Sequence, residues 1–335
     1  MINNVIETDH RLHAPRNRVN RKKRNKFSRF TPKPLLLFFC FFILPSGGIQ
    51  AQSAYSGLEN WFHSESLSLA GSGGALSSVE SDRLNPGALG ELPRQFHLSF
   101  LRYPADINAE SLSLILPAKR GFYALGLRHL NYGIFEGFDT EGQPTDNYSA
   151  GDTWVTLSTG RTLKSQRIAW GITAGLFLSQ LGNYQSTALV FTPGILFNIK
   201  SINGKLGFSI QNLGKIIDRY TRAREQLPTT VVTSVSKSLQ HLPLELFIDG
   251  GYRLTTGTSW LRLGGIFQLP YKFQLKWGTN TDKFSQQTRT NITNDFLGSS
   301  GIGLSYRSKE YHFDLGSYFY GTGGWISSIG FGVTF

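Results

Sequence analysis

The sequence is poor in cysteine and in charged residues, and each shortage argues against a class of protein. Cys40 is the only cysteine among 335 residues, so a disulfide framework and a cysteine-based metal site are both excluded within one chain. Charged residues make up only 17% of the chain, whereas 37 glycines and 13% aromatic residues are present. This balance favours an all-β architecture, because aromatic side chains fit a pleated surface and helix-favouring charged residues are few.

The net charge of +12 is concentrated at the start of the chain. Ten of the 34 Lys and Arg residues and two of the 22 acidic residues lie in residues 1–51, which leaves the rest at +4. A basic stretch at 21–29 precedes an apolar run at 35–44, and small residues follow as far as Ala51. This order predicts a secretory signal peptide over residues 1–51, cleaved after Ala51, and no nucleic-acid partner. The apolar run is too short for the roughly 20 residues of a membrane-spanning helix.

From Phe96 to Phe335, segments of about ten residues alternate apolar with small or polar side chains, as strands with two different faces do. Phe96, Leu98 and Phe100 share one such face, and Trp170 and Ile172 share another. There are fourteen segments by this count. Alternation alone fits both a soluble sandwich, with its apolar face inward, and a membrane barrel, with its apolar face toward lipid.

The connections between segments separate these two cases. Tight turns such as 118–120, 200–202 and 307–309 alternate with links that include all the long ones. Consecutive connections of a membrane barrel lie on opposite sides of the bilayer, with short turns on the periplasmic side and longer loops outside. We therefore predict an outer-membrane antiparallel β-barrel of about fourteen strands over residues 96–335, with both ends in the periplasm and lipid as its surroundings.

Charged residues fall on the polar face of several predicted strands. In a barrel that face lines the lumen, where buried charges need partners or water. We expect an ion-pair network drawn from Lys205, Glu245, Asp249, Arg253, Arg262, Lys272, Lys276, Arg307 and Asp314.

The final strand alternates apolar Ile329, Phe331, Val333 and the terminal Phe335 with small residues. It resembles the C-terminal assembly signal of outer-membrane proteins, which the barrel-insertion machinery reads. The resemblance implies that machinery as a partner.

Two short stretches near the N-terminus carry a wider resemblance. Leu69-Ala-Gly-Ser-Gly-Gly-Ala-Leu76 and Arg83-Leu-Asn-Pro-Gly-Ala-Leu89 resemble the N-terminal signature of the FadL-like outer-membrane superfamily, with Gly87 in place of the usual alanine. The resemblance implies a fourteen-stranded barrel whose N-terminal segment, here 52–95, packs as a periplasmic plug. It assigns Asn85, Pro86, Gly87 and Leu89 to the plug motif. Asn-Pro also begins turns, and Asn can bond its own downstream backbone.

A narrower resemblance lies in Tyr132-Gly-Ile-Phe135, Asp139-x-Glu141-Gly142 and Tyr148-Ser-Ala-Gly-Asp152, which are similar to the PorV/PorQ branch. That branch is associated with type IX protein secretion, and it implies docking of secreted proteins or of secretion-machinery components. The expected long loops 133–151, 213–228 and 282–298 would supply the binding surface.

Transport of hydrophobic small molecules, which the wider superfamily implies, is the alternative function. Lumen glycines such as Gly171, Gly175 and Gly207 would thin the wall and leave room for a ligand. The five histidines after the leader have no ligand spacing, and no Gly-x-Ser-x-Gly elbow or phosphate loop occurs. We therefore expect no catalytic, metal-binding or cofactor-binding residues and no enzyme activity. The sequence leaves docking and transport both open.

Overall fold

The computed structural model describes residues 55–119, 121–163, 167–222, 225–284 and 297–335. The predicted signal peptide lies outside the described residues, and so does most of the predicted loop 282–298. In the described part, the bounds of the strands are β1 (Gln95–Arg102), β2 (Asn108–Ala118), β3 (Gly121–Phe138), β4 (Pro144–Thr162), β5 (Ile168–Leu181), β6 (Tyr184–Ile199), β7 (Gly204–Gln211), β8 (Leu213–Asp218), β9 (Thr230–Ser238), β10 (Leu244–Arg253), β11 (Thr258–Gln268), β12 (Phe273–Asn280), β13 (Ser300–Arg307), β14 (Tyr311–Phe319) and β15 (Trp325–Thr334).

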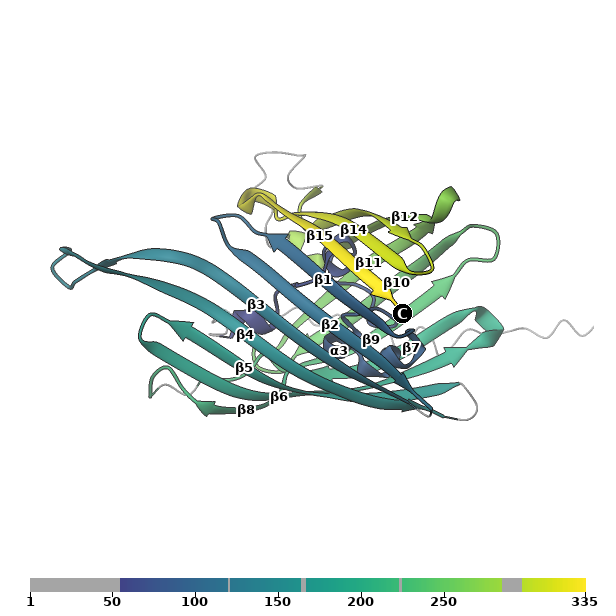
Figure 1. Ribbon diagram of the computed structural model, residues 1–335, viewed down its shortest axis with the longest axis horizontal. Coiled ribbons are helices and arrows are strands. Elements are labelled where there is room, and N and C mark those ends of the chain that lie inside the picture. Colours follow the sequence, from purple (N-terminus) through teal and green to yellow (C-terminus); the bar gives the residue numbers. More distant parts are fainter. Residues whose placement is uncertain (1–54, 120, 164–166, 223–224, 285–296) are drawn as a thin grey trace, which may run out of the picture. The chain divides into compact units, whose positions relative to one another are not determined.

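The strands form one closed antiparallel barrel (Figure 1). Outside the region of β7 and β8, each strand pairs with its neighbours in the chain, and β1 pairs with β15 over all eight of its residues. Both β7 and β8 pair with β6, so they are two parts of one interrupted strand. The barrel therefore has fourteen strands, which confirms the predicted number.

The interruption between β7 and β8 lies at Asn212, whose backbone has a positive φ of 55°. On the facing strand stands Pro193, which has no N–H to donate to the ladder. Beyond Asn212, β8 pairs with β6 alone, whereas β9 begins at Thr230 and pairs with β7. The wall of the barrel thus lacks ladder hydrogen bonds between β8 and β9.

The outward faces are apolar, whereas many inward positions are small or polar. Leu157 and Leu315 are 64% and 54% exposed on the outside, whereas the adjacent Ser158 and Asp314 are 4% and 3% exposed on the inside. This is the reverse of a soluble sandwich, and apolar side chains that face outward need lipid rather than water around them. The predicted strand phase is confirmed.

The inside of the barrel is filled by residues 55–92, which we call the plug. Its short helices are η2 (Ser56–Leu58), α2 (Ser64–Ser68), α3 (Ser81–Leu84) and η3 (Pro86–Glu91), and most of its residues are buried. Contacts of α2 with β13 and β14, and of η3 with β4, β5 and β6, hold it to opposite parts of the wall. Within the described ranges, no helix has the length and apolar character to cross a membrane.

Two of the predicted loops are wrong in extent. The segment 133–151 is mostly ladder, because β3 and β4 run for 18 and 19 residues and leave only 139–143 as the turn. The resulting hairpin extends past the neighbouring strands in Figure 1. The segment 213–228 begins with β8. Both errors have the same cause: in these segments apolar and polar residues do not alternate regularly, so the pattern does not mark them as strand.

Candidate functional site: the plug seat and the mouth cavity

The plug motif is held in the wall by Asn85. Its side-chain amide donates to the carbonyl of Ile195 on β6 (3.1 Å), while its Oδ1 accepts from the N–H of Gly87 (3.2 Å). Asn85 thereby caps η3, and Pro86 occupies the first turn of that helix, where a missing N–H costs nothing. Leu89 is fully buried with Ile115 and Phe122 of the wall.

Glycines on the inner face let the plug backbone approach the wall. A Cβ on Gly278 would lie 2.1 Å from the carbonyl oxygen of Leu69, one on Gly301 would lie 2.2 Å from that of Leu67, and one on Gly171 would lie 2.6 Å from that of Pro86. These distances are far below van der Waals contact. The expectation that lumen glycines leave room for a ligand is therefore wrong at Gly171, because plug backbone already occupies that space.

A buried ion-pair network joins α2 of the plug to β12, β13 and β14. The Lys276 ammonium donates to Glu65 of the plug (2.7 Å) and to Asp314 (2.9 Å), and the Arg307 guanidinium also donates to Glu65 (2.8 Å). His97 on β1 lies 3.3 Å from Asp314. Both carboxylates thus have charged partners, as buried charges require.

Four more of the predicted lumen charges also contact the plug. Asp249 accepts from the backbone N–H groups of Gly73 (2.6 Å) and Gly74 (3.0 Å), and the Arg262 guanidinium donates to the carbonyl of Gly71 (3.2 Å). Two partly exposed ion pairs also join the wall to the plug: Arg253 pairs with Glu59, and Lys205 pairs with Glu91.

Two of the predicted charges stand apart. Glu245 faces a cavity of about 810 Å³ at the turn end of the barrel, together with Lys205. Lys272 does not face the lumen: it lies exposed in the short η5 turn (Pro270–Lys272), where its φ is 69°. The prediction placed it on the polar face of a strand, but the turn runs from Leu269 to Lys272 and β12 begins only at Phe273.

The C-terminal residues of the predicted assembly signal lie on the outer face of β15. Ile329 and Phe335 are exposed, Phe331 and Val333 partly so, and Phe331 packs on Phe313 with ring centroids 5.1 Å apart. The Phe335 N–H donates to the carbonyl of Arg94, which ties the end of the chain to the start of β1.

The end of the barrel where 139–143 and 182–183 connect strands contains a cavity of about 600 Å³, which we call the mouth cavity. A one-residue bulge shapes it. Asn131 pairs with Gly151 and Gly133 with Ala150, so Tyr132 is an extra residue on β3, and the residues beyond it exchange faces. Phe135 consequently points inward. The apolar and aromatic lining consists of Tyr132, Phe135, Ala150, Leu181, Tyr184 and Tyr220, and the polar lining of Ser56, Asp152, Ser179, Gln180, Thr221 and Glu225.

Asp152 forms the polar floor of this cavity. Tyr132 donates its hydroxyl proton to one oxygen of Asp152 (2.7 Å), Ser179 donates to the other oxygen, and Tyr220 donates to Ser179. Burial raises the pKa of the Tyr220 phenol, which lies outside the strands, so this hydroxyl keeps its proton.

An apolar cluster adjoins the mouth cavity inside the barrel. Tyr220 stacks on Tyr55 of the plug with ring centroids 6.3 Å apart. Tyr55 belongs to a buried cluster that reaches the interrupted wall, formed by Tyr55, Leu58, Trp154, Phe177, Ala188, Val190, Ile216 and Leu227.

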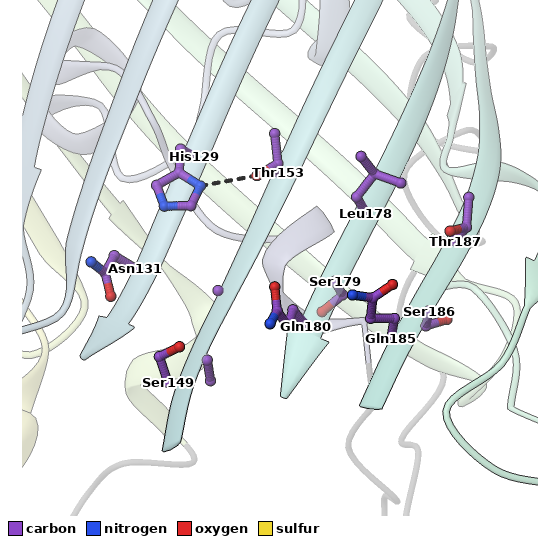
Figure 2. Close-up of a pocket in the computed structure, with 12 residues that line it drawn as sticks. His129, Asn131, Ser149, Thr153, Leu178, Ser179, Gln180, Gln185, Ser186 and Thr187 are labelled. Carbon is purple, nitrogen blue, oxygen red and sulfur yellow. Dashed lines mark hydrogen bonds between the residues drawn. The ribbon is translucent and has the colours of Figure 1, made fainter. Parts of the chain in front are cut away.

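A polar groove of about 390 Å³ crosses the outer face of β3 to β6 (Figure 2). His129 and Thr153 are joined there by a hydrogen bond of 3.0 Å, and Asn131, Gln180 and Gln185 line the groove further along. His129 and Thr153 are the next outward-facing residues after Leu127 on β3 and Val155 on β4. The groove therefore marks where the outer apolar band ends. The mouth cavity therefore lies at the polar side of that boundary.

Sequence reasoning missed the mouth cavity. Tyr132, Phe135 and Asp152 all lie within the stretch that carries the narrower resemblance, but nothing in its spacing reveals the bulge that turns Phe135 inward. Within the described ranges, no group of three or more His, Cys, Asp or Glu side chains is placed to hold a metal ion.

Comparison with known proteins identifies the fold. No sequence profile of a known family matches the chain, and no curated protein matches it. Among solved structures, one of the toluene transporter TodX from Pseudomonas putida superposes with a TM-score of 0.56 at 10% identity, over 83% of this chain and 99% of TodX. A second TodX structure gives 0.50 at 9% identity, over 81% and 96%. A FadL homologue from Pseudomonas aeruginosa gives 0.47 at 10% identity, over 81% and 96%. The TodX structures thus place this chain in the fold of the FadL-like outer-membrane barrels.

Proposed function

We propose that this protein carries small hydrophobic molecules across the outer membrane of a bacterium. The mouth cavity carries the proposal. It is a space of about 600 Å³ with aromatic walls and a polar floor, at the water-facing edge of the apolar band. Cavities of this size and character are where proteins bind small molecules.

A route onward from the cavity follows from the packing. The plug fills the axis of the barrel, so a solute has no straight path along it. The apolar cluster around Tyr55 and Ile216 instead leads to the wall between β8 and β9, where ladder hydrogen bonds are missing. Side chains close that place in this structure: Thr229 donates to the carbonyl of Asn212 (2.9 Å). A sideways exit there would release an apolar solute into lipid, which it prefers to water.

The likeness to TodX supports the same function, since TodX is a toluene transporter, although at 10% identity the likeness itself concerns the fold alone. The docking function expected from the PorV/PorQ resemblance gains no support. That expectation rested on the resemblance, with three long loops as the binding surface, and the first of these, 133–151, is a β-hairpin. The proposal includes no catalytic step.

A reversible lock tests both the function and its route. Cys40 is the only cysteine of the chain, so an Asn212→Cys/Thr229→Cys pair introduces the only two thiols after the leader. Uptake of naphthalene is measured in cells that produce the protein in their outer membrane. We expect oxidation of the pair to slow uptake and reduction to restore it, and the two single-cysteine variants serve as controls.

Two results would count against these ideas separately. Equal naphthalene uptake with and without the wild-type protein would overturn transport. If uptake requires the protein but is equally fast before and after oxidation of the cysteine pair, the exit between β8 and β9 would be overturned, whereas transport itself would not.

A further inference from the structure

We propose that the mouth cavity prefers aromatic molecules that donate a hydrogen bond, such as phenols, and disfavours aromatic carboxylates. This inference rests on the proposed function, since it names the class of solute that the same cavity admits. It follows from the direction of the hydrogen bonds in the cavity floor, the charges of the lining and the aromatic walls.

The hydroxyl protons of the floor are already committed. Tyr132 and Ser179 both donate to Asp152, and Tyr220 donates to Ser179. A phenolic oxygen that donates its one proton can still accept through its lone pairs. These three hydroxyl groups therefore offer a solute acceptors rather than donors.

The charges of the lining act in the same direction. Asp152 and Glu225 are acidic, and among the described residues that line the cavity there is no Lys, Arg or His. One carboxylate oxygen of Glu225 is buried without a hydrogen-bond partner in the described part of the chain. A solute carboxylate would meet like charge in a partly desolvated space without a cation to pair with, which is unfavourable.

The walls explain why the solute is aromatic. Phe135 stacks on Tyr148 with ring centroids 5.4 Å apart and an interplanar angle of 19°, and so presents a fixed ring edge and face to the cavity. Tyr184 stands on the adjacent hairpin and is 60% exposed, so its ring has surface left to cover. Offset-stacked and edge-to-face contacts with such rings favour a flat aromatic solute.

Three probes with one ring system separate these contributions: naphthalene, 2-naphthol and 2-naphthoate. Their retention by the protein in lipid nanodiscs is measured by equilibrium dialysis against empty nanodiscs. We expect 2-naphthol to bind up to about tenfold more tightly than naphthalene, the ratio that a net hydrogen bond of favourable strength gives. We expect 2-naphthoate to bind more weakly than naphthalene.

The variant Asp152→Asn tests the cause, because it removes the charge that orients the hydroxyl protons. We expect it to reduce the preference for 2-naphthol to about twofold or less and to improve binding of 2-naphthoate. Asp146→Asn is the matched control: it removes the same charge from an exposed position on the same strand, outside the cavity. It should leave all three affinities unchanged.

Tyr220→Phe provides a second test should Asp152→Asn fail to assemble, since Tyr220 lies outside the strands and its hydroxyl makes no ladder hydrogen bond. It should lower 2-naphthol binding alone. Equal binding of the three probes to the wild type, or an unchanged preference in the assembled variants, would overturn the donor selectivity while leaving hydrophobic transport intact. Failure of the wild type to retain any of the three would instead count against the proposed function.

Discussion

At the residue scale, Asp314 shows how the plug is fastened. This carboxylate is 3% exposed and accepts from Lys276 and Ser305 while lying 3.3 Å from His97. Lys276 also donates to Glu65 of α2 in the plug. Asp314 therefore positions the lysine that binds the plug. The attachment of the plug is therefore electrostatic and well shielded from water.

Asp314→Asn is accordingly expected to destabilise the barrel by about 3–5 kcal/mol, because removing one member of a buried pair leaves the other uncompensated. The midpoint of denaturant-induced loss of the heat-modifiable barrel measures the change. Arg102→Gln is the control, since Arg102 and Asp106 form an exposed pair with side chains 73% and 85% accessible. Such pairs contribute about 0–1 kcal/mol. Similar losses in both variants would contradict the role of the network.

Gly278 supports a second prediction at this scale. An added Cβ would lie 2.1 Å from the Leu69 carbonyl oxygen, which is backbone and cannot rotate away. We expect Gly278→Ala to displace this part of the plug and make it accessible to a protease that the wild type resists. On the neighbouring strand, Gly265→Ala places its Cβ 3.0 Å from the outward Trp277 ring, which can shift. Equal protease resistance of the two variants would show that the plug does not need the glycine.

At the element scale, the strands were predictable and their ends were not. Alternation over Phe96–Phe100 or Trp170–Leu176 specifies which face meets lipid, because a strand has a period of two and one face must be apolar. Beyond the apolar band neither face has to be apolar, so the sequence predicted loop where the ends of β3 and β4 lie. The bulge at Tyr132 was hidden for the same reason, so the cavity that it shapes could not be predicted.

Excision of residues 136–147 addresses the projecting hairpin. These residues form only the outermost ladder pairs of β3 and β4, such as Gly137 with Thr145, so the barrel is expected to assemble normally. Loss of the tip should loosen the stacked Phe135 and Tyr148 and weaken retention of naphthalene several-fold. Heat-modifiability of the variant reports assembly, and dialysis against nanodiscs reports retention. Full retention would mean that the hairpin does not shape the mouth cavity.

At the scale of the whole molecule, the plug and the lumen charges act as one unit. The sequence motif around Asn85 and the polar inner faces were each visible in the sequence, but not that the charges reach across to the plug. That pairing depends on which plug residue meets which strand, and it follows from three-dimensional closure of the barrel rather than from spacing along the chain.

Deletion of residues 55–92 tests this unit. The inner charges of Lys276, Arg307 and Asp314 would then line a water-filled space, since without Glu65 they need solvent as their partner. We expect the deleted protein, once reconstituted in a planar bilayer, to conduct ions steadily, whereas the wild type should conduct little. A heat-modifiable deletion variant with the low conductance of the wild type would show that strands or loops, not the plug, close the barrel.

The extra residue at Tyr132 has a consequence for how such a barrel can change over generations. Up to that point the residues of β3 alternate between lipid-facing and lumen-facing positions. One inserted residue reverses which residues of the sequence take each face beyond it. Loss of the Tyr132 codon would restore the regular ladder and leave Phe135 opposite Tyr148, still facing inward, but the mouth would lose the hydroxyl that reaches Asp152, without any change in the strands below. The chemistry of the mouth is thus open to revision by insertions and deletions of one codon, while the part of the wall that meets lipid stays the same.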